Sequence, residues 1–481
     1  MKITTGNGND NVIRPVQNNG KVFRSNDTIN TGAGNDTINA GLGKRDYVYG
    51  GAGIDHLIVD YSVGDTGGGM FFNSTYGRTG TAYRTSGVPN TRRLDYTFFK
   101  DIEQFTVIGT SKDDTIKVYF GAKEIQAGAG NDRVIGNSGT IDGGSGFDYL
   151  TLDLSKQTSN LNLSNLSNIN LPGIVTATNF ERFSITTGNG NDIVTQSGTL
   201  DGTVLRANDT IKTGDGDDII NAGLGDDYVR GGKGSDRLIL DYSAGDTGTG
   251  MRFYAGKSSG SAVRSVSSTD STRLDDIFFS RIEHFTVIGT SKDDSIRIFA
   301  IGNDVINAGA GNDTIKVGAG DANISGGAGN DTIDGGSGND TLLGGSGDDI
   351  LIGGSGNDVL TGGGNKDSFL YENSYAFKSA TFGIDSITDF TTLSDKIVLD
   401  KSTFRALESD LGNGFSIGNE FAIVDNDAAA ATSAAKIVYN QGSGDIFYNE
   451  NGTEDGFGTG AQFIELTDNP LLSASDFVIK A

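Results

Sequence analysis

The stretch from Gly335 to Gly363, GGSGNDTLLGGSGDDILIGGSGNDVLTGG, decides the fold because it gives three near-copies of one nine-residue phrase. Each phrase has glycines at its start, an aspartate at its sixth place and an aliphatic residue at its eighth place. Glycine lets the backbone turn at positive φ, and the tripeptide around the aliphatic residue suits a short strand. The phrase therefore predicts a tight turn followed by a short strand, repeated every nine residues.

The repeat runs without a gap from Ala308 to Leu370 as seven phrases, one of which carries Ala322 at the sixth place. The other six phrases supply Asp313, Asp331, Asp340, Asp349, Asp358 and Asp367. Shorter runs in the same phase supply Asp36, Asp132, Asp148, Asp218, Asp227 and Asp236. In AGLGKRDYVY one extra residue, relative to AGLGDDYVR, leaves the register of Asp46 open.

Stacking of these phrases places aspartates above one another. Two phrases form one flat coil, in which the middle residue of each short strand points inward, so that stacked coils enclose a thin apolar column. Aligned aspartates repel by about 1 kcal/mol per pair in water, and by several times more where water is scarce. Divalent cations reverse this repulsion. Calcium accepts about six to eight oxygens from carboxylates and carbonyls in loose geometry, so the glycine turns favour calcium over magnesium.

The composition also indicates cationic partners. The chain of 481 residues has 62 acidic and 37 basic residues, a net charge of −25, no cysteine and two histidines. This charge argues against binding nucleic acid, and the histidines are too few for a multi-histidine zinc site. The first residues lack the apolar segment of a cleavable signal, and no stretch is long enough to span a membrane. We therefore expect no membrane insertion, and export through another route.

The chain is internally duplicated. LIVDYSVGDTGGGM and LILDYSAGDTGTGM lie about 180 residues apart. Each is followed by a long segment outside the repeat, which we call an excursion, and then by an apolar strand at which the repeat resumes. The last part has less glycine, and KIVYNQGSGDIFYNENG predicts a hairpin with a glycine turn. We predict a repeat module at 1–186 with excursions at 60–102 and 153–180, its duplicate at 187–302 with an excursion at 241–282, an uninterrupted roll at 303–370 and a β-rich C-terminal domain at 371–481.

The nine-residue phrase resembles the consensus of the repeats-in-toxin (RTX) family, GGxGxDx-aliphatic-x. The resemblance implies an all-β fold, a right-handed parallel β-roll or β-solenoid, that binds Ca²⁺ between the turns of successive coils. In this family a site is shared by turns two repeats apart, so seven phrases permit at most 7 − 2 = 5 pairings, and Ala322 affects one or two of them. By resemblance, the ligand role falls to the sixth-place aspartates named above.

The C-terminal part has a resemblance of its own. DSITDFTTLSDKIVLD (Asp385 to Asp400) is similar to the phrase that follows the repeats in serralysin-type proteins, and SASDFVIKA resembles their type I secretion signal. This implies export by type I secretion machinery to an extracellular or cell-surface location. The protease motif H-E-x-x-H of serralysins is absent, so that activity is not implied.

The excursions concentrate basic residues within an acidic chain, namely Arg78, Arg84, Arg92 and Arg93 in the first copy, with Arg252, Lys257, Arg264 and Arg273 in the second, beside Tyr76, Tyr83 and Tyr254. Two interpretations remain open. These residues bind an anionic polysaccharide or cell surface, or they pair with nearby acids and cover the roll.

We therefore predict a secreted calcium-binding repeat protein that folds on calcium outside the cell and serves as a structural, surface or adhesion component. The alternative is a polysaccharide-modifying enzyme, an epimerase or lyase, with its groove along a parallel β-helix face. No catalytic residue is assigned. Gly256, Ser258 and Gly260 spell G-x-S-x-G without the strand-to-helix pattern that such a nucleophile needs.

Overall fold

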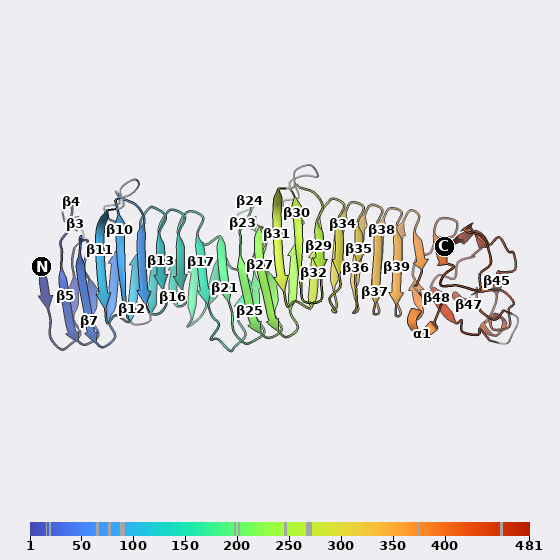
Figure 1. The fold of residues 1–481 in the computed structure, drawn as a ribbon, viewed down its shortest axis with the longest axis horizontal. Helices are drawn as coiled ribbons and strands as arrows, with labels where there is room; N and C mark the ends of the chain where they lie inside the picture. Colours follow the sequence, from blue (N-terminus) through green and yellow to red (C-terminus); the bar gives the residue numbers. More distant parts are fainter. Residues whose placement is uncertain are drawn as a thin grey trace. The chain divides into compact units, whose positions relative to one another are not determined.

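The computed structural model describes residues 1–15, 17–18, 21–63, 67–75, 78–86, 92–196, 199–200, 203–244, 248–265, 272–373, 375–452 and 456–481. These residues form short strands with very little helix, which confirms the predicted all-β class (Figure 1). The chain divides into two compact units, Met1–Gly234 and Ser235–Ala481. Among the described residues, no helix is long and apolar enough to cross a membrane.

The seven uninterrupted phrases form two parallel sheets in the second unit. One sheet contains β34 (Val305–Ala310), β36 (Asn323–Ala328), β38 (Thr341–Ser346) and β40 (Val359–Gly364). The other contains β35 (Thr314–Lys316), β37 (Thr332–Ser337), β39 (Ile350–Ser355) and β41 (Ser368–Tyr371). Each strand pairs with the strand two phrases later, as Ile333 does with Leu351. Two phrases therefore make one coil of a roll, as predicted.

A thin apolar column fills the roll. The eighth-place side chains are each at most 1% exposed, and they are Ile315, Ile324, Ile333, Leu342, Leu351, Leu360 and Phe369. Their neighbours along each strand point outward because side chains alternate across a strand. A column with one eighth-place apolar side chain per phrase is a small core, so contacts at the turns must contribute to stability.

The first unit has the same architecture. One sheet contains β1 (Lys2–Thr4), β5 (Thr28–Ala33), β7 (Asp46–Ala52), β13 (Thr115–Val118), β15 (Arg133–Gly136), β17 (Tyr149–Asp153), β21 (Arg182–Thr186), β25 (Thr210–Asp215) and β27 (Asp226–Lys233). Strands facing it include β2 (Asn11–Ile13), β6 (Thr37–Asn39), β8 (His56–Asp60), β12 (Gln104–Ile108), β14 (Ala122–Gln126), β16 (Gly139–Asp142), β20 (Val175–Thr178), β22 (Ile193–Thr195) and β26 (Ile219–Asn221). The excursion at 153–180 adds β18 (Asn162–Leu163) and β19 (Asn168–Leu171), and the latter is antiparallel to β20.

Each long excursion is a three-stranded meander inserted into a parallel sheet. In the first unit β10 (Thr79–Thr85) is antiparallel to β9 (Met70–Thr75) and β11 (Arg93–Lys100), while β11 pairs in parallel with β7 and β9 with β13. In the second unit β29 (Arg252–Ala255), β30 (Ser259–Ser265) and β31 (Arg273–Ser280) repeat the meander, and β29 pairs in parallel with β33 (Ser295–Ile298). The sheet therefore continues through the insertion.

A buried ion pair holds each meander. Arg84 Nη2 lies 2.7 Å from Asp95 Oδ2 with both side chains fully buried, and Arg84 also donates to the carbonyl of Tyr61. Arg264 and Asp275 repeat this pair at 2.7 Å in the second copy. Arg84 and Arg264 are thus internal, and for these two the interpretation as ion-paired side chains holds. Tyr76 lies outside the described residues.

The C-terminal region continues the roll before it departs from it. β42 (Asp385–Ile387) pairs with β40 and β43 (Lys396–Asp400) with β41, both in parallel. The predicted hairpin is present as β46 (Ile437–Asn440) and β47 (Asp445–Tyr448). The remaining elements are β28 (Arg237–Asp241), β32 (His284–Ile288), β44 (Gly412–Asn413), β45 (Phe421–Val424), β48 (Gln462–Leu466), β49 (Phe477–Lys480), α1 (Ser379–Phe382), α2 (Asp427–Ala430) and the 3-10 helix η1 (Ala474–Asp476), with two-residue strands β3 (Gln17–Asn18), β4 (Lys21–Val22), β23 (Thr199–Leu200) and β24 (Thr203–Val204).

The turn glycines are required because successive turns nearly touch. Gly329 has φ +127°, and a Cβ built on it would lie 1.9 Å from the carbonyl oxygen of Gly311. We predict that Gly329→Ala destabilises the calcium-loaded protein by about 1–3 kcal/mol. Thermal unfolding measures the effect. The control is Gly418→Ala, because Gly418 has no atom within 4 Å of a built Cβ; equal melting temperatures for the two variants would contradict the prediction.

Candidate metal centre

The sixth-place aspartates stand in columns at the turns that precede the strands. The backbone N–H of each aspartate donates to Oδ1 of the aspartate one coil later, from Asp313 to Asp331 at 2.8 Å and from Asp331 to Asp349 at 2.7 Å. The opposite edge of the roll repeats this contact from Asp340 to Asp358 at 2.8 Å. One oxygen of each carboxylate is therefore occupied by the backbone of a neighbouring coil.

The second oxygen of these carboxylates is buried without a hydrogen-bond partner. Within the described residues this holds for Oδ2 of Asp36, Asp132, Asp148, Asp313, Asp331, Asp340, Asp349 and Asp358. The residues themselves are at most 2% exposed. A buried carboxylate oxygen with no partner is costly, so each turn presents an acceptor that a bound cation would satisfy.

The surroundings of the free oxygen are backbone. A Cβ built on Gly326 would lie 2.3 Å from Asp331 Oδ2, so the carboxylate folds back over the first glycine of its own phrase. Within the described residues, no three carboxylate or histidine side chains converge on one point. A cation at a turn would thus take one or two carboxylates and complete its shell with carbonyl oxygens. Such an all-oxygen donor set fits calcium.

A second, outer column lies at the fifth place of the phrase, outside the inner columns of sixth-place aspartates. Its hydrogen bonds run in the opposite sense, because the N–H of the later coil donates to the side chain of the earlier one. Asp348 N–H donates to Asn330 Oδ1 at 2.8 Å, and Asp348 Oδ1 accepts from Lys366 N–H at 3.1 Å. This place accepts both asparagine and aspartate, so its role is to join turns by hydrogen bonds that do not require a charged side chain.

All twelve aspartates predicted from the sequence occupy the inner columns or the equivalent turn positions, and none is more than 3% exposed. Asp46 also lies in register, because Asp27 N–H donates to Asp46 Oδ1 at 2.8 Å. The extra residue of AGLGKRD is taken up in the turn before Asp46. The assignment of these residues as calcium ligands remains a prediction.

The columns contain aspartates beyond the twelve predicted. Asp55 and Asp192 close GGAGID and TGNGND, which carry the glycines of the phrase. The others lie in phrases without the full glycine pattern, namely Asp27, Asp114, Asp209, Asp294, Asp304, Asp385 and Asp395. Most share the signal Asp-x-aliphatic. Glutamates replace aspartate where the chain re-enters after an excursion, since the N–H groups of Asp55, Asp148 and Asp236 donate to Glu103, Glu181 and Glu283 at 2.8, 2.7 and 2.9 Å.

Burial makes these carboxylates poor acids while no cation is bound. It raises the pKa of Asp313 and Asp340 to about 7 and that of Asp132 to about 8, and neighbouring carboxylates raise these values further. Backbone N–H donors act in the opposite direction. A divalent cation would reverse the shift by favouring the ionised form.

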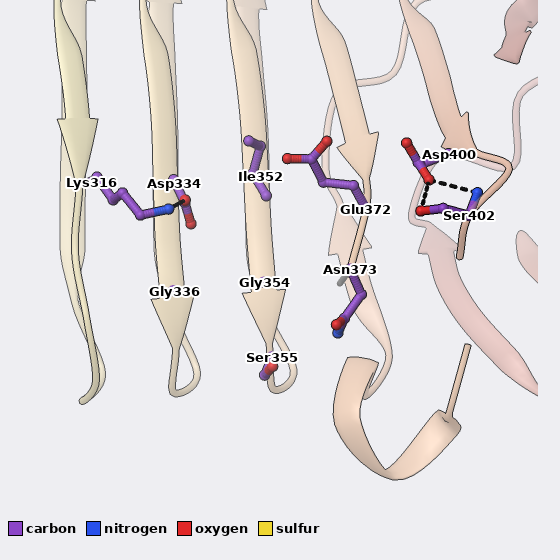
Figure 2. A pocket seen from close by; sticks show the side chains of 10 residues that line it. All are labelled: Lys316, Asp334, Gly336, Ile352, Gly354, Ser355, Glu372, Asn373, Asp400 and Ser402. Carbon is purple, nitrogen blue, oxygen red and sulfur yellow. Dashed lines mark hydrogen bonds and ion pairs between the residues drawn. The ribbon is translucent and has the colours of Figure 1, made fainter. Parts of the chain in front are cut away.

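A hollow of about 470 Å³ lies on the outer face of strands β35 to β43 (Figure 2). Gly336 and Gly354 line it, and three carboxylates border it. Asp334 pairs with Lys316, Asp400 Oδ1 accepts from Ser402, and Glu372 pairs with Lys480. These contacts already engage the carboxylates, so the hollow gives no ground for assigning a catalytic acid and base.

Comparison with protein families matches the RTX calcium-binding nonapeptide repeat at residues 24–57, 108–140, 124–150, 206–238, 301–333, 317–351 and 343–371. The chain therefore contains RTX nonapeptide repeats, and these repeats bind Ca²⁺. All twelve predicted aspartates lie within the matched segments.

The search of curated proteins finds no match. Among solved structures, the extracellular lipase LipA from Serratia marcescens matches with 16% identity and a TM-score of 0.15 over 63% of this chain. The match covers 40% of the lipase, so the chain spans less than half of that protein's length.

The raised pKa values predict how stability depends on pH when calcium is removed. Between about pH 4 and pH 7 the unfolded chain ionises its aspartates while Asp313 and Asp340 in the roll still hold protons, so the free energy of unfolding falls as pH rises. Urea unfolding in calcium-depleted buffer measures this. Calcium binding at pH 6 should release protons, and more of them than at pH 8. No proton release at pH 6 would contradict the prediction.

A pair of neighbouring residues tests the inner column against the outer one. We predict that Asp349→Asn removes about one bound calcium per chain and destabilises the calcium-loaded protein by about 1–3 kcal/mol. Asp348→Asn should change neither quantity, because asparagine already fills the fifth place at Asn330 and Asn339. Metal counting and thermal unfolding give the readouts. Equal losses from the two variants would remove the distinction between the columns.

Proposed function

We propose that this chain is a secreted structural or surface component whose folding is switched on by calcium outside the cell. The observation that supports it most is the column of buried carboxylate oxygens without partners, such as Oδ2 of Asp331 and Asp349. Each adds a desolvation cost to the calcium-free fold, and the chain also carries a net charge of −25. A cation that binds only the folded roll stabilises it by mass action.

The ion concentration then selects the compartment in which the chain folds. Where free calcium is scarce, one thin apolar column must offset both the chain entropy and the carboxylate burial, so the unfolded chain is favoured. Where calcium is abundant, every occupied turn contributes binding free energy to folding. An acidic chain of this kind stays threadable inside the cell and becomes rigid outside it.

The C-terminal segment supports the same order of events. The last strand, β49, pairs in parallel with β43, and its Phe477 and Ile479 are at most 1% exposed. This strand contains four of the nine residues of SASDFVIKA, the segment that resembles a type I secretion signal. A secretion system that recognises an extended segment must therefore bind this strand before the C-terminal region folds. Folding would then have to follow export.

The expected partner of such a component is a cell surface or an anionic polysaccharide. The support for this is the distribution of charge, since Arg93, Lys117 and Arg133 lie on strands β11, β13 and β15 and contact aromatic rings there. No specific observation favours the alternative of an epimerase or lyase.

Calcium removal tests the proposal directly. In chelator at pH 7.5 to 8 the full chain is expected to show little β signal in circular dichroism, and millimolar calcium should restore it in one cooperative step. Magnesium at the same concentration should restore much less, because it demands an octahedral shell and keeps its water. A chain that is fully folded in chelator would overturn the proposal.

A further inference from the structure

A row of outward side chains crosses seven neighbouring strands of the first unit. Cross-strand register places side by side Tyr96, Tyr83, Phe71, Thr115, Arg133, Tyr149 and Arg182. The residues next to them in sequence, such as Ala82, Phe72 and Leu150, are fully buried, so alternation directs this row away from the core. We call it the aromatic–cation row (strands β11 to β21 in Figure 1).

Cations lie over the rings of this row. The Arg93 guanidinium is 4.6 Å from the ring centre of Tyr83 and 4.7 Å from that of Tyr96. Arg133 and Arg182 lie 4.6 and 5.0 Å from the ring centre of Tyr149, and Lys117 lies 5.9 Å from that of Phe71. Such contacts hold long side chains in place without neutralising them.

The row has almost no acidic neighbours. The seven strands of the row contain two acidic residues, Asp95, which is fully buried, and Asp153, which is exposed at the end of β17. Within the described residues no ion pair involves Arg93, Lys117 or Arg133. In a chain with 62 acidic residues, this face keeps a net positive charge.

The duplicated copy shows that the fold does not require the row. It keeps the buried pair of Arg264 and Asp275 but replaces Tyr96 by Asp276 and Tyr83 by Val263. Arg273, the counterpart of Arg93, forms an ion pair with Asp276. The meander of the first copy thus carries the row, and the meander of the second copy has the same strands without it. The row is therefore not needed for the meander to fold.

We propose that the aromatic–cation row binds one chain of an anionic polysaccharide laid across the strands, with Arg93, Lys117 and Arg133 as the main contacts. Strands lie about 4.8 Å apart, so the row spans about 29 Å and offers several cations along its length to a polymer with repeating carboxylates. Guanidinium groups match carboxylates by two parallel hydrogen bonds, and groups already held over rings lose little freedom on binding.

The overall charge of the chain narrows the choice of partner. A net charge of −25 repels polyanions everywhere except at such a local patch, and a single linear patch suits a linear polymer better than a wide acidic protein surface. The inference rests on the proposed function in one respect only, because calcium must first assemble the sheet that carries the row.

The test measures binding of the calcium-loaded full chain to hyaluronate, a carboxylated polysaccharide, with neutral dextran as the control ligand. The triple variant Arg93→Ser, Lys117→Ser, Arg133→Ser should bind hyaluronate at least 10-fold more weakly at about 0.1 M salt. A charge-matched control removes three cations of the second copy by Arg252→Ser, Arg273→Ser and Arg297→Ser, and it should bind like the unaltered chain.

Equal weakening by both triple variants would overturn the inference, because binding would then reflect total charge. Binding of the unaltered chain to anionic lipid vesicles or to an acidic protein, but not to hyaluronate, would overturn it as well. If the first triple variant fails to gain β signal with calcium, the double variant Lys117→Gln, Arg133→Gln replaces it, with an expected loss of at least 3-fold. A chain that folds without calcium yet shows the row-dependent binding would refute the proposed function and leave the row assigned.

Discussion

The structure depends on a carboxylate that is satisfied on one side only. At each turn one oxygen of an aspartate accepts the backbone N–H of the preceding coil, and the other oxygen faces turn backbone without a donor, as in Asp331 and Asp340. The first contact fixes the spacing of the coils. The second opposes folding, because a buried anion without compensation is costly, and in the proposed function a bound cation offsets that cost.

Much of this follows from the sequence because the nine-residue phase fixes three features together. Glycine allows the tight turn, aspartate occupies the sixth place at that turn, and the aliphatic residue points inward from the strand. One phrase such as GGSGDDILI therefore predicts Asp349 at a buried turn and Leu351 in the core. These are local properties of a short repeat. They are confirmed wherever the phrase occurs, even at Asp46, where the turn absorbs an additional residue without disturbing the strand that follows.

The rest depends on pairing between distant segments. Glu103 and Glu283 lie in the columns because the chain returns from each meander next to the following coil. No nearby nine-residue phrase shows in the sequence where the chain rejoins the stack. Arg84 and Tyr83 are adjacent in sequence and in the same strand, yet one is buried with Asp95 and the other lies on the outer face. Which of them points inward is set by the register of β10 against β9 and β11, and the sequence of the excursion does not contain that register.

The way the meanders enter the sheet also limits how this architecture can be lengthened. Strands β7 and β13 run in the same direction, and the inserted strands β11, β10 and β9 link them through parallel, antiparallel, antiparallel and parallel contacts. Such a graft restores the original polarity only if it brings an odd number of strands, because a simple two-stranded hairpin would leave one mismatched junction. The duplicated copy also inserts three strands, so segments with an odd number of strands can be added to the roll without reversing the direction of its parallel strands.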